Sequence, residues 1–120
     1  MSPHSDLEAK YASCPVIKTL EEVGSRWRLT VIHVLREGEL RFNELKRATD
    51  ANSQTLSRVL DDLEETGYVE RRVEEESPIA VYYSLTPKGD DLLSAFDEIL
   101  EWGEKWIDDD DRPDGEESGA

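Results

Sequence analysis

The residues best suited to recognise another molecule lie in one short stretch, 53–58. The amide of Gln54 can form two hydrogen bonds to adenine, and the guanidinium of Arg58 can do the same with guanine. Thr55 and Ser57 add hydroxyl groups between them. Together these side chains could read base edges in the major groove of duplex DNA.

The same stretch begins a pattern of apolar residues at helical spacing. The positions i, i+3, i+4 and i+7 are filled by Leu56, Val59, Leu60 and Leu63. A helix with this pattern has one apolar face, which turns Gln54, Thr55, Ser57 and Arg58 outward on its N-terminal half. That half is where a recognition helix meets bases. Alternatively, the polar face is simply solvated, as on most isolated helices.

A second group of residues is suited to the DNA backbone. Basic and small polar side chains hold phosphates and orient a protein on the duplex. The residues that we assign to this group are Arg41, Asn43, Lys46, Arg47, Ser53, Arg71 and Arg72. They can act together only if the fold gathers them around residues 53–58.

The elements flanking residues 53–58 predict such a fold. A short helix over 43–48 and a turn over 49–52 precede the second helix, which Asn52 or Ser53 caps and Gly67 ends. Strands over 68–73 and 81–85 follow, joined by a tip over 74–80. This order predicts a mostly α protein with a small β-hairpin, the winged helix-turn-helix, whose helix and hairpin form one convex surface.

Further helices are predicted on either side. The first of them starts at Cys14, with Pro15 at its first helical position, and ends at Gly24. Ser25 caps the second, which ends at Gly38 and is followed by a short strand over 40–42.

Thr86 caps the last predicted helix. Its long apolar stripe exceeds what one small core can cover, so we expect a helix-paired homodimer on a palindromic site. The expected interface residues are Leu92, Phe96, Ile99, Leu100, Gly103 and Trp106. The alternative is that the stripe is ordinary core.

The chain resembles the HxlR family of small dimeric transcription regulators. The resemblance rests on Cys14-Pro15-Val16, Gly24, Trp27, Arg41-Phe42-Asn43-Glu44-Leu45, Tyr83-Ser84-Leu85-Thr86, Gly89 and Glu101-Trp102-Gly103. It implies a DNA-binding homodimer and favours repression over activation.

The chain departs from this family in two places. Relatives commonly carry a basic residue where Thr55 stands and others near Val59 and Asp61. In addition, the acidic hairpin tip Glu74-Glu75-Glu76 would repel phosphate. We therefore restrict the expected contacts of the hairpin to Arg71 and Arg72.

Composition divides the chain into an N-terminal arm over 1–13, a winged helix-turn-helix domain over 14–107 and an acidic tail over 108–120 that we expect to be disordered.

No apolar run is long enough to cross a bilayer, and the first residues lack the features of a secretory signal. A single cysteine fits a reducing cytoplasm. One cysteine and two separated histidines predict no metal site, and nothing predicts a cofactor or an enzyme.

The net charge of −15 conflicts with DNA binding, because DNA-binding proteins usually carry a basic surface. Two interpretations follow. Either the chain is a winged-helix adaptor that binds other proteins, or it works in the concentrated salt of a halophile, where exposed charges are screened. A continuous basic patch from Arg41, Lys46, Arg47, Arg58, Arg71 and Arg72 would favour the second.

Cys14 has two interpretations of its own. At the N-terminus of a helix the dipole favours the thiolate, and some members of the HxlR family sense electrophiles or oxidants with a cysteine at this position. Alternatively, Cys14 is a small buried residue beside the dimer interface. A redox or small-molecule effector is therefore an expectation to test.

Overall fold

The computed structural model describes residues 10–11, 13–75 and 78–107. The predicted tail lies outside these ranges, as do most of the predicted arm and residues 76–77 of the hairpin tip. The chain forms two compact units, Met1–Asp90 and Asp91–Ala120. The elements of the first unit are α2 (Pro15–Val23), α3 (Arg26–Val34), η1 (Leu35–Glu37), β1 (Leu40–Arg41), α4 (Phe42–Thr49), α5 (Ser53–Glu65), β2 (Val69–Glu74) and β3 (Ala80–Leu85). The long helix α6 (Pro87–Trp106) begins there and continues into the second unit.

The predicted caps set the starts of three helices. Ser25 Oγ accepts a hydrogen bond from the Arg28 amide at 3.2 Å, and Asn52 Oδ1 accepts one from the Thr55 amide at 2.8 Å. Thr86 Oγ1 accepts one from the Gly89 amide at 3.2 Å. Each bond satisfies an amide that has no partner within its own helix. The caps predicted at Ser25 and Thr86 are thus confirmed, and of the two residues predicted as possible caps of α5, Asn52 and Ser53, the cap is Asn52.

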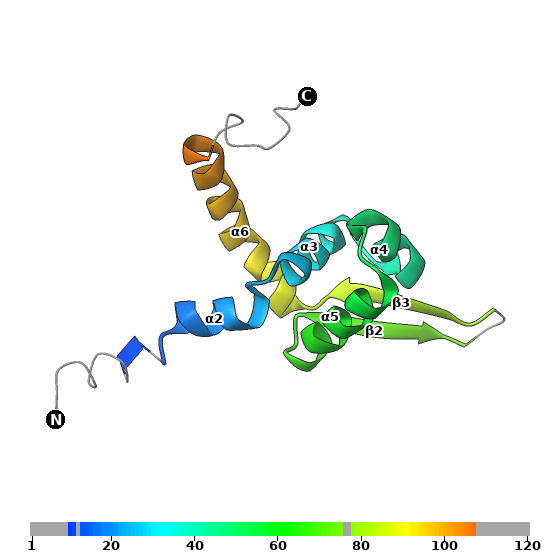
Figure 1. The fold of residues 1–120 in the computed structure, drawn as a ribbon. Coiled ribbons are helices and arrows are strands. Elements are labelled where there is room, and N and C mark those ends of the chain that lie inside the picture. Colours follow the sequence, from blue (N-terminus) through cyan, green and yellow to red (C-terminus); the bar gives the residue numbers. More distant parts are fainter. Residues whose placement is uncertain (1–9, 12, 76–77, 108–120) are drawn as a thin grey trace. The chain divides into compact units, whose positions relative to one another are not determined.

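The helix-turn-helix packs around α3. Val31 and Ile32 of α3 are buried, as is Leu45 of α4. The whole predicted apolar face of α5 is buried as well, namely Leu56, Val59, Leu60 and Leu63. Figure 1 shows α3, α4 and α5 close together, with the β2–β3 hairpin projecting past them. The buried face determines which side of α5 remains exposed.

The turn between α4 and α5 is tighter than predicted. Thr49, expected in the turn, belongs to α4, where its hydroxyl donates to the Leu45 carbonyl at 2.8 Å. Asp50 follows in the left-handed region with a φ of 60°. Aspartate tolerates this conformation better than most residues. The buried Ala51 and the cap Asn52 then lead directly into α5.

The sheet has the order β1-β3-β2, with antiparallel neighbours. Both long strands extend further into the predicted tip than expected, to Glu74 and from Ala80. Gly67, as predicted, takes a left-handed φ of 87° between α5 and β2. At the start of α6, Gly89 lies so close to the Tyr68 carbonyl that a Cβ atom would overlap it. This close approach gives Gly89 a steric role at the base of the hairpin.

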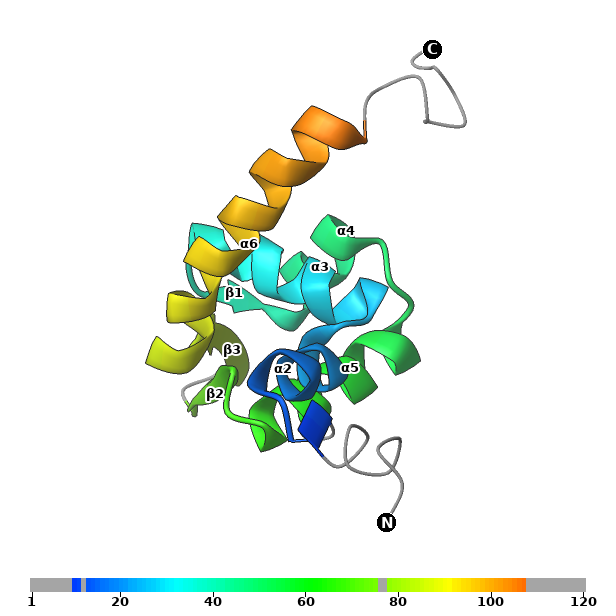
Figure 2. The same cartoon turned by 90° about the vertical axis from the view of Figure 1, so that its left-hand side faces the viewer.

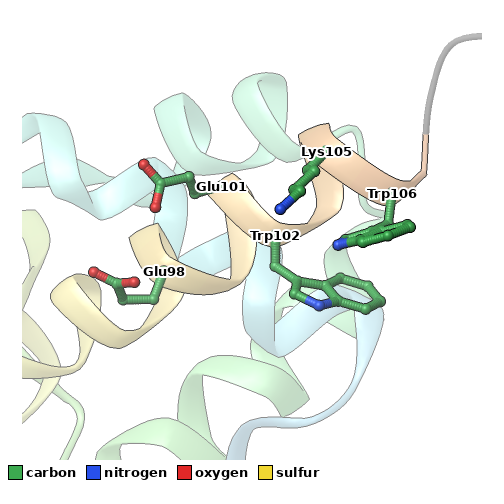
Figure 3. A pocket seen from close by; sticks show the side chains of 5 residues that line it. All are labelled: Glu98, Glu101, Trp102, Lys105 and Trp106. Atoms are coloured by element: carbon green, nitrogen blue, oxygen red, sulfur yellow. The ribbon is translucent and has the colours of Figure 1, made fainter.

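The helix α6 carries large apolar side chains at exposed positions. Ile99, Leu100, Trp102, Trp106 and Ile107 are each more than half exposed. Trp102 and Trp106 lie one turn apart and line a hollow together with Glu98, Glu101 and Lys105 (Figure 3). Among the described residues, no helix has the length and apolar character needed to span a membrane.

Candidate nucleic-acid interface

The exposed side of α5 carries the residues predicted to bind base edges in the major groove. Ser53, Gln54, Ser57 and Arg58 are exposed, and Thr55 is half-buried. Arg58 makes no ion pair with any other described residue, so its guanidinium is available to a ligand. A guanidinium and an amide one turn apart on an exposed helix face are suited to hydrogen bonds with the edges of guanine and adenine.

The residues predicted to hold phosphates on α4 and β1 are also exposed: Arg41, Asn43, Lys46 and Arg47. The Arg41 amide donates to the Glu44 carboxylate at 2.8 Å, which starts α4. The Arg41 guanidinium lies 5.8 Å from the centre of the Tyr82 ring. This stacking holds a positive charge at the junction of the sheet and α4.

The two arginines of the hairpin lie on opposite faces of the sheet, because successive strand residues alternate. Arg72 is paired across the strands with Tyr82, whereas Arg71 is paired with Tyr83. Arg41 also pairs with Tyr82, so Arg41 and Arg72 flank one aromatic ring. The predicted pair is therefore divided between two surfaces.

Arg72 is occupied within the chain. Its guanidinium binds the two carboxylate oxygens of Glu39 at 2.8 and 3.0 Å and the carboxylate of Glu74 at 2.9 Å, and it lies 4.5 Å from the centre of the Tyr82 ring. The hydrogen bonds from Arg72 lower the pKa of Glu39. Three of the five N–H donors of Arg72 are therefore engaged, and the adjacent carboxylates of Glu39 and Glu74 would repel a phosphate. The geometry thus favours Arg71 over Arg72 as a phosphate contact.

Arg71 shares its face with acidic residues of α5. The pKa of Tyr83 is raised, first by burial and then by the charge of Glu64, while Arg71 lowers it and Asp61 adds a further increase. Arg71, Glu64 and Asp61 therefore all lie close enough to Tyr83 for their charges to shift its pKa. The C-terminal half of α5 is acidic where it approaches the hairpin, in contrast to its N-terminal half. Any DNA contact should centre on the N-terminal half.

Several contacts around the C-terminal ends of α2 and α5 were not predicted from the sequence. Arg28 of α3 binds Asp62 of α5 at 2.9 Å. The Tyr68 hydroxyl donates to the Glu22 carboxylate at 2.7 Å, and burial together with this acceptor raises the pKa of Tyr68 to about 12. Lys88 donates to the Thr66 carbonyl at 2.7 Å. These partners are far apart in the sequence, so no local pattern identifies them.

The predicted dimer residues differ in their exposure. Ile99, Leu100 and Trp106 are 60%, 55% and 63% exposed, whereas Phe96 is buried and Leu92 half-buried. A Cβ built on Gly103 would meet no atom of the described chain within 4 Å apart from its own stretch of helix backbone. On α2, Val16 and Leu20 are exposed as well. Cys14, at the start of α2, is half-buried, and its amide donates to the Tyr11 carbonyl at 3.1 Å.

Comparisons with known proteins point to one family. Residues 22–111 match the family described as HxlR-like helix-turn-helix. An uncharacterised HTH-type transcriptional regulator of Methanothermobacter thermautotrophicus is 36% identical over 94 residues, covering 78% of this chain and 72% of the relative. The reduced form of YodB, a transcriptional regulator of Bacillus subtilis, is 37% identical with a TM-score of 0.70, covering 78% of this chain and 93% of YodB. The redox regulator HypR in its reduced form is 35% identical with a TM-score of 0.72, covering 78% and 94%.

Proposed function

Because the chain belongs to the HxlR-like helix-turn-helix family, whose members are transcriptional regulators and not enzymes, we propose that it represses transcription as a homodimer bound to a palindromic operator. Each protomer presents the N-terminal half of α5 to the major groove. Arg58 and Gln54 read bases there, with Thr55 and Ser57 beside them. Arg41, Asn43, Lys46, Arg47, Ser53 and Arg71 hold the backbone.

The observation that carries the proposal is the division of α5 into two faces. Its apolar face is buried, so the opposite face of its N-terminal half presents Gln54, Ser57 and Arg58 to the outside. Basic residues of α4 and β1 are exposed nearby in the chain, at Arg41, Lys46 and Arg47. A helix-turn-helix uses these two parts together, one for bases and one for phosphates.

The proposed dimer is supported by apolar surface that the protomer leaves exposed. The α6 side chains Ile99, Leu100 and Trp106 are exposed, which costs free energy in water, and in the other unit Val16 and Leu20 of α2 are exposed as well. Gly103 supports the same view. Glycine inside a helix is about 0.5–1 kcal/mol less favourable than alanine. Nothing in the described chain requires Gly103, so the close approach of a partner helix would explain it.

The experiment that tests the function is selection of bound duplexes from a random-sequence pool, repeated in dilute and in molar KCl. We expect enrichment of sites with two-fold symmetry, each bound by one dimer. The matched control is a protein with Gln54, Ser57 and Arg58 all changed to Ala, which should enrich no site. Failure of the wild-type protein to enrich any duplex at any salt concentration would favour the alternative, an adaptor that binds other proteins.

The net charge of −15 leads to a prediction about salt. Ordinary DNA binding weakens as salt rises, with a slope near −0.9 per neutralised phosphate. Carboxylates such as Asp61 and Glu64, which lie one turn apart on α5, should repel one another and the phosphates. Salt screens both repulsions, because the Debye length falls to about 3 Å at 1 M. We therefore expect a higher melting temperature near molar KCl, and a DNA affinity that falls less steeply than the basic contacts imply or that rises.

The measurement is the melting temperature together with operator affinity from dilute to multimolar KCl. Sodium and potassium chloride should behave alike if screening is the cause. A fold that is equally stable in dilute salt, combined with a steep loss of DNA affinity on adding salt, would show that the protein is not adapted to a halophilic cytoplasm.

Cys14 is a candidate redox or electrophile sensor, since the similar YodB has been solved with a quinone bound and HypR is described as a redox regulator. The half-buried thiol stands at the start of α2. Addition of the Cys14 sulfur to 1,4-benzoquinone, with the thiol proton ending on the resulting hydroquinone, would place a ring at this helix. We expect operator affinity to fall on the order of tenfold, within the range of allosteric couplings.

The measurement compares operator binding and intact mass before and after quinone treatment. Cys14→Ser is the matched control, because it keeps the size of the side chain and removes the nucleophile. Equal loss of binding in the wild type and in Cys14→Ser, or modification without any change in binding, would leave Cys14 with a structural role only.

A further inference from the structure

The last turn of α2 is joined to α5 by one side chain of α3. Arg28 Nη1 donates to the carbonyls of Glu21 and Glu22 at 3.2 and 3.3 Å, while Nη2 donates to the Asp62 carboxylate at 2.9 Å. The last carbonyls of a helix have no partner within it, and the helix dipole favours a cation at that end. One guanidinium therefore ends α2 and holds the C-terminal half of α5. In both views these two helix ends lie side by side (Figure 1 and Figure 2).

A second set of contacts ties the same turn of α2 to the base of the hairpin. The Glu22 carboxylate accepts from the Tyr68 hydroxyl at 2.7 Å and lies 3.8 Å from the Lys88 ammonium. Lys88 also donates to the Thr66 carbonyl at the end of α5 and lies 4.3 Å from the centre of the Tyr68 ring. The end of α2 is thus connected to α5, to the residue preceding β2 and to the start of α6.

The chemistry of this joint suits orientation better than stability. The side chains of Arg28 and Asp62 are 28% and 38% exposed, and ion pairs at such positions contribute little to the free energy of folding. What the guanidinium provides is geometry, since its planar fork binds three acceptors from two helices in set directions. A lysine could not hold all three in the same way.

We infer that Arg28 is a positioning residue that sets the orientation of the recognition helix α5 relative to α2. The inference rests on the proposed dimer, in which the exposed Val16 and Leu20 of α2 face the partner. If α2 is anchored at the dimer interface, the angle between α2 and α5 determines how far apart the two recognition helices lie. Arg28 then determines which spacing between half-sites the dimer accepts.

The test measures binding to a series of palindromes that share the selected half-site and differ only in the number of base pairs between the halves. The wild type should prefer one spacing on the order of tenfold over its neighbours, the scale of effects carried through packed networks. Arg28→Met should bind all spacings nearly equally and should bind a single half-site as the wild type does. Measurements well below the melting temperature of each variant separate orientation from unfolding.

The matched control is Arg26→Met, which removes the same charge from an exposed position of the same helix, where the Arg26 guanidinium lies 5.1 Å from the centre of the Trp27 ring. Asp62→Asn should flatten the spacing preference partly, because the bonds to Glu21 and Glu22 remain, and its control is Asp61→Asn. Arg28→Lys should restore part of the preference.

An unchanged spacing preference in Arg28→Met, alongside that of Arg26→Met, would overturn the inference while leaving the proposed dimer intact. A wild-type protein that shows no spacing preference at all would instead count against the proposed dimer, and the inference would fail with it. The two failures are distinguished by the wild-type measurement alone.

Discussion

Replacing Ile99 with Asp is expected to convert the protein from dimers to monomers and to weaken operator binding on the order of 100-fold. Ile99 is 60% exposed in the protomer, so the substitution should leave the fold intact. In the proposed dimer the new carboxylate would be buried without a partner, which costs several kcal/mol. Light scattering over a range of concentrations measures the assembly, and circular dichroism confirms that the variant is folded.

The control for this substitution is Ser94→Asp. Ser94 is exposed on the opposite side of α6, so the variant adds the same charge away from the apolar stripe. It should remain a dimer. Phe96 is unsuitable for the same test because it is buried, and a charge there would disturb folding. A wild-type protein that is monomeric in molar salt, or an Ile99→Asp variant that remains dimeric, would refute the proposed interface.

The second large effect is expected from Arg58→Ala. Loss of a two-bonded contact to guanine should cost about 1–3 kcal/mol and relax the preference at one base position of each half-site. The fold should be unaffected, since Arg58 is exposed and has no ion pair among the described residues. Binding to a panel of operators with single base substitutions measures both the affinity and the preference.

Two neighbouring arginines provide the matched comparison for Arg58. Arg71→Ala should weaken binding to every operator in the panel about equally, because a phosphate contact carries no sequence information. Arg72→Ala should have a smaller effect on affinity, since Glu39 and Glu74 already occupy its guanidinium. If Arg58→Ala leaves both affinity and base preference unchanged, the proposed docking of α5 is wrong.

The helices could be predicted from sequence because their signals are local. The apolar face of α5 is confirmed, and its cap is Asn52, one of the two neighbouring residues that the sequence allowed for this role. The ends of the elements were less predictable. Thr49 extends α4 through a bond to the Leu45 carbonyl, and pairing across the hairpin extends both strands into the predicted tip. These extensions depend on contacts that a pattern of residue types does not contain.

The predicted DNA interface likewise has features that local sequence patterns reveal and contacts between distant residues that they do not. Exposure of Gln54 and Arg58 follows from helical periodicity, and the structure has both exposed. The separation of Arg71 from Arg72 was also available in the sequence, because adjacent strand residues face opposite ways. In contrast, the bonds from Arg28 to Asp62 and from Arg72 to Glu39 join residues 34 and 33 positions apart. Only the folded chain brings those partners together.

The most direct test of the central claim is methylation interference on a selected operator. Guanine N7 lies in the major groove, so methylating it blocks an arginine there. We expect two clusters of interfering guanines, one in each half-site and about 34 Å apart along the duplex, as two recognition helices of a dimer require. The interference should disappear from one guanine of each cluster in Arg58→Ala. A single cluster, or binding that N7 methylation does not change, would contradict a dimer that places two copies of α5 in the major groove.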